Sequence, residues 1–110
     1  MNLDFKMIEN SLIVRLSGEF DLHTADYFKE QIEDKLSSKI NNLILDLSEI
    51  KFIDSSGLGA ILAKYKQLNN RGGKLAIVNP TPQVKRIFEL SGILKIINIY
   101  SSEQEAISSL

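Results

Sequence analysis

Short apolar runs alternate along this chain with segments whose apolar residues recur at helical spacing. Residues 43–45 and 75–78 are continuous apolar runs, which are typical of strands buried on both faces of a sheet. Between them, the spacing over residues 58–68 indicates an amphipathic helix. Strands that alternate with helices pair in parallel through right-handed crossovers. The pattern therefore predicts an α/β domain whose mostly parallel sheet of about four or five strands packs against helices.

The chain opens with a predicted β-hairpin over residues 3–8 and 12–16, and Gly18 is expected to break its second strand. A helix should follow, with Thr24 as its N-cap and Asp26 in its first turn, where an acidic side chain suits the helix dipole. The apolar stripe of this helix consists of Ala25, Phe28, Ile32 and Leu36.

The clearest helical stripe lies in the middle of the chain, and Lys64 falls outside it. Its members are Leu58, Ile61, Leu62, Tyr65 and Leu68. A further helix should begin with Thr81 as its N-cap, followed by a proline, and should end at Gly92. Residues 96–100 are predicted to form the last strand, and the capping-box spacing at 102–105 predicts a terminal helix.

Composition limits the chemistry available to the chain. The absence of cysteine excludes disulfides, thiolate zinc sites and thiol redox chemistry, and the single histidine, His23, argues against a histidine-based metal site. A net charge of −1 gives no electrostatic basis for nucleic-acid binding. No apolar run approaches membrane-spanning length, and residues 1–4 lack the layout of a signal peptide. We therefore expect a cytoplasmic protein of one domain, residues 1–110, with no cofactor or metal and with no nucleic-acid or membrane partner.

Two predicted loops carry most of the polar chemistry. Residues 19–24 follow the second strand, and residues 54–57 connect a buried strand to the central amphipathic helix. In open α/β sheets, functional sites gather where loops leave the carboxyl ends of the strands. Both loops fit this description, which makes them the candidate positions for a functional site.

The Asp-Ser-Ser-Gly junction at residues 54–57 allows three interpretations. Asp54 or Ser55 can simply cap the helix, since Asp and Ser are favoured at helix starts. However, Gly57 and Gly59 fall in the first turn of the helix, where each costs about 0.5–1 kcal/mol relative to alanine. A cap does not require these glycines, whereas the close approach of another backbone or of a ligand does.

The second interpretation is a nucleophilic serine. Ser55, His23 and either Asp21 or Asp54 supply the residue types of a catalytic triad. The Gly-x-Ser-x-Gly motif of the nucleophile elbow is absent, however, because no glycine lies two residues before the serine. The spacing of a phosphate-binding P-loop is not met either.

The third interpretation is a serine that accepts a phosphate. Ser55 would be exposed at the strand–helix turn, and phosphorylation would add about −1.5 to −2 charges at pH 7. A helix N-terminus tolerates an anion, so the fold should survive the modification. Together with Asp21 and Asp54, the phosphate would make the local surface strongly negative, and a partner docked there would be repelled.

Several segments, in the correct order, resemble the STAS domain family of bacterial anti-sigma factor antagonists. Residues 52–59 are similar to the family signature, and residues 18–25 to its Gly-Glu-Leu-Asp loop. Residues 43–47 resemble its central strand, and residues 73–75 and 84–92 resemble its later elements. The resemblance covers nearly the whole chain.

The resemblance implies a regulator that is not an enzyme. In its unphosphorylated form such a protein binds an anti-sigma factor that is also a serine kinase, and so frees a sigma factor for transcription. The kinase uses ATP to phosphorylate the first serine after the aspartate of the motif, which is Ser55 here. A serine phosphatase reverses the modification.

The resemblance also implies roles for the residues around Ser55. Asp21 would lie near the phosphoacceptor, Asp54 would orient the serine hydroxyl, and Gly57 and Gly59 would let the partner approach the helix start. Leu58 would add contact area or belong to the core. The implied partner-binding set is Asp21, His23, Thr24, Asp54, Ser56, Gly57, Leu58 and Gly59.

The sporulation-type antagonists share the Asp-Ser-Ser-Gly form and the His-Thr-Ala that follows the Asp loop. Leu22 departs from them, because they often carry a second histidine there, and general stress-response antagonists have the same fold. The free protein is expected to be a monomer. The alternative function is a ligand- or nucleotide-sensing STAS module without phosphoregulation.

Overall fold

The computed structural model describes residues 1–110, which form a five-stranded sheet in the order β1-β2-β3-β4-β5. The antiparallel hairpin of β1 and β2 opens the chain, and β2 to β5 run parallel to one another. The predicted sheet, mostly parallel after an opening hairpin, is thus confirmed. The strands are β1 (Asn2–Ile8), β2 (Ser11–Phe20), β3 (Asn42–Ile53), β4 (Lys74–Val78) and β5 (Asn98–Tyr100).

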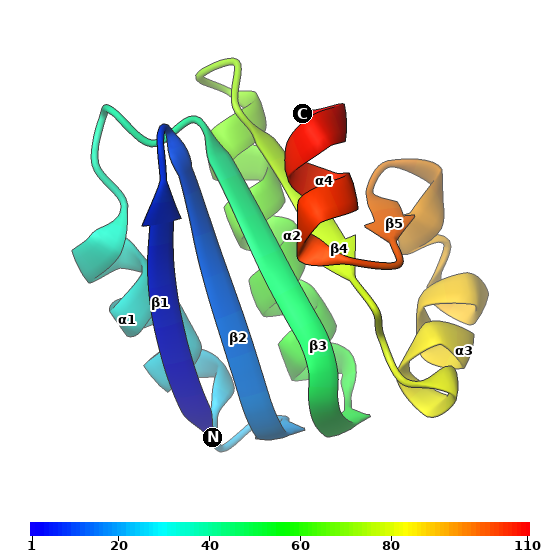
Figure 1. Cartoon of the computed structure of the whole chain (residues 1–110). Helices are drawn as coiled ribbons and strands as arrows, with labels where there is room; N and C mark the ends of the chain where they lie inside the picture. The colour runs from blue at the N-terminus through cyan, green and yellow to red at the C-terminus, as the bar shows by residue number, and fades with distance from the viewer.

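Helices cover both faces of the sheet unequally (Figure 1). Three of them lie against one face, with the main apolar core between them and the sheet, whereas α4 lies on the other face over a much smaller cluster around Ile44 and Ala106. The three-helix layer therefore supplies most of the buried apolar area. The helices are α1 (Ala25–Lys35), α2 (Ser55–Asn69), α3 (Pro82–Ser91) and α4 (Glu103–Ser109), with a short 3₁₀ helix, η1 (Ile93–Lys95), after α3.

Three predicted helix boundaries are confirmed by capping hydrogen bonds or by backbone conformation. The Thr81 hydroxyl accepts a hydrogen bond from the Val84 N–H at the start of α3. Gly92 ends α3 with a φ of 79°, in the left-handed region that suits glycine. The Ser102 hydroxyl accepts a hydrogen bond from the Glu105 N–H at 3.0 Å, as its capping-box spacing predicts.

Strand β2 is longer than predicted, and the expectation that Gly18 ends it is wrong. The strand continues to Phe20 because its last residues pair with β3, and Gly18 (φ 104°) lies at a register shift within this pairing. The left-handed conformation that glycine permits is used here for an irregularity inside a strand and not for a turn. As a result, Phe20 is buried and the next loop begins level with the end of β3.

The structure corrects the expected role of Thr24, and it buries Lys64 although that residue falls outside the apolar stripe. Thr24 occupies the N-cap position of α1 but does not cap it, because its hydroxyl accepts the Asp21 N–H and donates to the Glu19 carbonyl, both at 2.9 Å. Lys64 is only 5% exposed. Its ammonium lies 2.8 Å from a carboxylate oxygen of Glu33 on α1, so the side chain is buried between two helices and is not on a solvated face.

Candidate functional site

The candidate site lies where β2 and β3 end, because the two predicted loops meet there. The Asp54 N–H donates to the Phe20 carbonyl at 3.2 Å. In the opposite direction, the Leu22 N–H donates to Oδ2 of Asp54, also at 3.2 Å. The loops at 19–24 and 54–57 are therefore joined by hydrogen bonds at this end of the sheet.

Asp54 is the N-cap of α2 and joins that helix to the neighbouring loop. Its Oδ1 accepts the Ser56 N–H at 2.8 Å and the Gly57 N–H at 3.1 Å, while Oδ2 holds Leu22. The carboxylate makes no hydrogen bond to the Ser55 hydroxyl, so it does not have the orienting role that we expected. It instead satisfies donors that a helix start leaves unpaired.

Ser55 is the first residue of α2 and is exposed, whereas Ser56 is half-buried. No protein group is hydrogen-bonded to the Ser55 hydroxyl, and Asp54 already occupies the cap that Ser55 could have filled. Of the two serines, Ser55 is thus the one that an external enzyme can reach more easily.

The two glycines of the motif serve different purposes. A Cβ on Gly57 would lie 2.5 Å from the Phe20 carbonyl oxygen and 2.8 Å from Cγ1 of Ile53. Gly57 is therefore needed because the start of α2 packs directly against the backbone at the end of β2. This is the close approach of another backbone that the sequence predicted. Gly59 is exposed, and no atom lies within 4 Å of its Cβ position. Packing inside the domain does not account for Gly59.

The loop at 21–24 is held by its own side chains. Oδ1 of Asp21 accepts the His23 N–H at 2.9 Å, and the Asp21 carbonyl accepts the N–H groups of Thr24 and Ala25. The His23 side chain is exposed and makes no hydrogen bond to Ser55 or to a carboxylate. The residue types of a triad are near one another in the fold, but the geometry of a triad is not assembled.

Leu22 is a surface residue of this site that the sequence analysis did not include. Its side chain is 69% exposed in the middle of the loop. An apolar side chain inside an otherwise polar loop was the signal that could have identified it.

Leu58, by contrast, is half-buried and packs against the main core, so it contributes to the core as well as to the surface. Beside the loop lies an open hollow of about 420 Å³, whose lining includes Glu19, Asp21 and Lys51.

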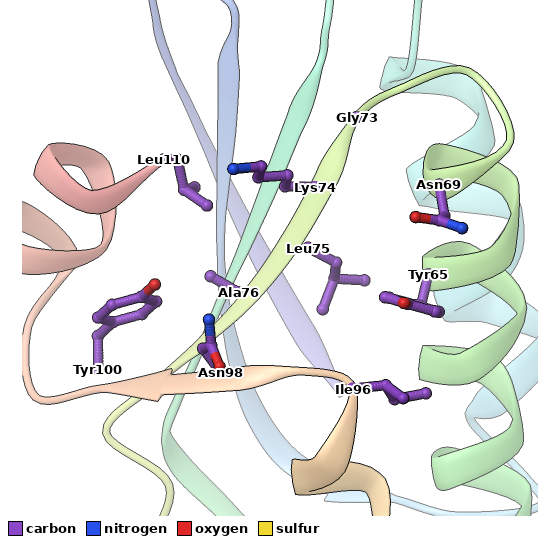
Figure 2. A pocket seen from close by; sticks show the side chains of 10 residues that line it. All are labelled: Tyr65, Asn69, Gly73, Lys74, Leu75, Ala76, Ile96, Asn98, Tyr100 and Leu110. Carbon is purple, nitrogen blue, oxygen red and sulfur yellow. The ribbon is translucent and has the colours of Figure 1, made fainter.

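A second cavity lies at the other end of the sheet (Figure 2). It is about 230 Å³ in volume and borders Lys74, which begins β4, whereas Ser55 follows the end of the parallel strand β3. Tyr65 and Asn69 of α2 and Tyr100 of β5 frame it (Figure 2). Lys74 is its only cationic side chain. This cavity is therefore separate from the serine site.

An ion pair fixes α4 to the sheet on the face away from α1. Arg15 of β2 donates two hydrogen bonds of 2.8 Å to the Glu103 carboxylate and lowers the pKa of Glu103 to about 2. Nearby, burial raises the pKa of Asp46 on β3, and the Glu103 carboxylate adds to that rise.

No group of three or more His, Cys, Asp or Glu side chains is arranged to hold a metal ion. None of the helices combines the length and apolar character needed to cross a membrane.

Comparison with known proteins gives the family. The STAS domain profile matches residues 2–106. The anti-sigma F factor antagonist of Paenibacillus polymyxa is 41% identical over 113 aligned positions, which cover 100% of this chain and 97% of the relative.

Solved structures of an antagonist of this family have the same fold. The anti-sigma factor antagonist SpoIIAA in its unphosphorylated form superposes with a TM-score of 0.84 at 26% identity, covering 98% of this chain and 95% of the other. The phosphorylated form of Bacillus SpoIIAA gives 0.76 at 25% identity, covering 98% of both chains. The fold, the junction and these relatives agree, and the chain therefore belongs to the STAS domain family, together with the anti-sigma factor antagonists.

Proposed function

We propose that this anti-sigma factor antagonist binds an anti-sigma factor that is also a serine kinase, and that phosphorylation of Ser55 switches the binding off. In the unphosphorylated state, binding would free a sigma factor for transcription. The observation that carries the proposal is the exposed Ser55 hydroxyl at the first position of α2, next to a loop that is fixed to the same helix start.

The local geometry supports an effect of the phosphate on the partner and not on the fold. Asp54 already accepts hydrogen bonds from the Ser56 and Gly57 N–H groups. A phosphate on Ser55 would therefore add about −1.5 to −2 charges beside the Asp54 carboxylate without replacing it as the helix cap. An exposed phosphate stays hydrated and need not displace the cap. A partner that covers Ser55 would have to desolvate this charge and would meet like-charge repulsion if acidic groups lie opposite.

Solved structures of relatives are consistent with this mechanism. SpoIIAA has been seen in unphosphorylated and phosphorylated forms, and this chain shares the fold of both. An antagonist fold of this kind therefore accommodates the phosphate. We further propose that a serine phosphatase restores the binding form, and that the free protein is a cytoplasmic monomer without enzymatic activity of its own.

The surrounding residues would have two kinds of role. His23 and Gly59 are exposed and would touch the partner directly. Asp54 and Gly57 would position the helix start, because their contacts are made inside the domain. The other proposed partner-binding residues are Asp21, Thr24, Ser56 and Leu58, each of which is half-buried and presents only part of its side chain.

Mass spectrometry tests the assignment. The anti-sigma factor is first co-purified with the tagged chain and then incubated with it and ATP. One phosphate is expected on Ser55 of the wild type, none on a Ser55→Ala variant, and one, still on Ser55, on a Ser56→Ala variant as the matched control. A phosphate found only on Ser56 would reverse the site assignment, and its absence from the wild-type chain would contradict the proposal.

The same preparation tests the alternatives. A ligand- or nucleotide-sensing module would bind a nucleotide directly, and this binding would regulate it without modification of Ser55. We expect no nucleotide binding by the isolated chain, because the cavity near Lys74 offers a single cationic side chain and no glycine-rich phosphate loop. His23→Ala should weaken partner binding at most and should still be phosphorylated on Ser55, whereas a hydrolase that used His23 as its base would lose its activity.

A further inference from the structure

Leu22 is an exposed apolar residue whose N–H is bonded to Asp54, the residue before Ser55. Its side chain is 69% exposed, and only Leu90, at 73%, exceeds it among the large apolar residues that the surface exposes. Single exposed apolar residues are common on protein surfaces and need no explanation by themselves. The position and the rigidity of Leu22 distinguish it from such residues.

The backbone on both sides of Leu22 is fixed by hydrogen bonds. The Leu22 N–H donates to Asp54, the Asp21 N–H donates to the Thr24 hydroxyl, and the His23 N–H donates to the Asp21 carboxylate. The loop therefore presents the leucine without having to be ordered when a partner binds. Such preorganisation lowers the entropic cost of association.

Leu22 also lies within the area that a kinase acting on Ser55 has to cover. It is bonded through its N–H to Asp54, which immediately precedes Ser55 in the chain. A protein whose catalytic groups reach the Ser55 hydroxyl excludes water from the adjoining surface, and an apolar side chain on a fixed backbone there gains from burial.

We propose that Leu22 is an apolar anchor for the anti-sigma kinase and inserts into an apolar pocket on that partner. This inference rests on the proposed function and adds a residue and a partner chemistry to it. The anchor acts in binding and not in the chemistry of phosphate transfer, because a leucine offers no group that could move a proton or stabilise charge. The phosphate on Ser55 would act beside the anchor, by holding the partner's pocket away from it.

The test compares Leu22 with a matched leucine elsewhere on the surface. Leu22→Ala should weaken binding of the purified anti-sigma factor about 30-fold, which corresponds to ~2 kcal/mol at 1.4 kcal/mol per tenfold. Leu90→Ala in the last turn of α3 should change it less than twofold, and Leu22→Met should retain most of the affinity because it keeps the apolar volume. Circular dichroism and urea denaturation should show all three variants folded like the wild type.

Phosphorylation kinetics separate anchoring from catalysis. For Leu22→Ala, the kinase should show a raised KM for the antagonist and an unchanged kcat, because the anchor is lost and the serine is not. Binding of Leu22→Ala within twofold of the wild type, or a fall in kcat at constant KM, would overturn the anchor. If the wild-type chain neither binds nor is phosphorylated, the proposed function fails and the anchor fails with it. If the wild-type chain does both and Leu22→Ala equals it, only the anchor fails.

Discussion

Gly57 and Gly59 are two residues apart in α2, yet the structure predicts opposite effects when each is replaced by alanine. A Cβ on Gly57 would meet the Phe20 carbonyl oxygen at 2.5 Å and Ile53 at 2.8 Å. The first of these is a backbone atom that cannot rotate away. At Gly59 the same atom would enter open space. The pair therefore separates a steric requirement from simple helix propensity.

The magnitudes follow from two opposing terms. Overpacking costs about 1–3 kcal/mol, and we place Gly57→Ala near the upper end because the contact with Phe20 is so short. The higher helix propensity of alanine stabilises the helix by about 1 kcal/mol relative to glycine. The net loss of stability for Gly57→Ala should be about 2 kcal/mol. Gly59→Ala has only the favourable term and should gain about 0.5–1 kcal/mol.

Urea denaturation of the two variants, monitored by circular dichroism, measures this difference. The midpoints should move in opposite directions with an unchanged slope, and the free energies of unfolding should differ by roughly 3 kcal/mol. Equal stability of Gly57→Ala and Gly59→Ala would refute the steric argument. Gly59→Ala should also bind the anti-sigma factor less well despite its greater stability, because the added methyl group faces the partner.

Three further predictions concern groups that join elements of the fold. Asp54→Ala should destabilise the domain by about 1–2 kcal/mol in urea denaturation, since it removes the α2 cap and releases the neighbouring loop; Asp54→Asn should lose less, and equal losses would contradict this. The folded-state pKa of Glu103 is about 2, below its ordinary value near 4.5, so its contribution is present above pH 4.5 and is lost as the pH falls towards 2. Arg15→Gln should therefore flatten the pH dependence of thermal stability in that range, and an unchanged profile would rule this out. Lys64→Met should stay within about 1 kcal/mol of the wild type, whereas Lys64→Ala should lose about 1–3 kcal/mol, because it leaves a gap between α1 and α2; equal stability of the two would count against this packing role.

The order of the elements and the place of the site follow from local patterns. Apolar runs at 43–45 and 75–78 indicated buried parallel strands, and the rule that functional sites gather at the carboxyl ends of such strands singled out the loops at 19–24 and 54–57. Both inferences depend on short continuous apolar runs and on the 3.6-residue period of the helices between them, which sequence displays directly. Ser55 was likewise located by its motif and its place at a helix start.

What sequence did not reveal depends on residues far apart in the chain. The burial of Lys64 requires Glu33, which lies on another helix, and a lysine beside an apolar stripe ordinarily belongs to a solvated face. Strand β2 continues past Gly18 because its last residues pair with β3. Asp54 likewise uses its second oxygen on Leu22, 32 residues earlier, so the link between the two loops could not be read from the motif alone.

The central claim is that a phosphate on Ser55 changes partner binding without changing the fold. Isothermal titration of the anti-sigma factor with unphosphorylated and Ser55-phosphorylated chain tests it most directly, with circular dichroism as the check on folding. A loss of ~3–4 kcal/mol, which weakens binding by several hundredfold at 1.4 kcal/mol per tenfold, is the predicted result, with superimposable spectra for the two forms. Equal affinities for the two forms would contradict the account.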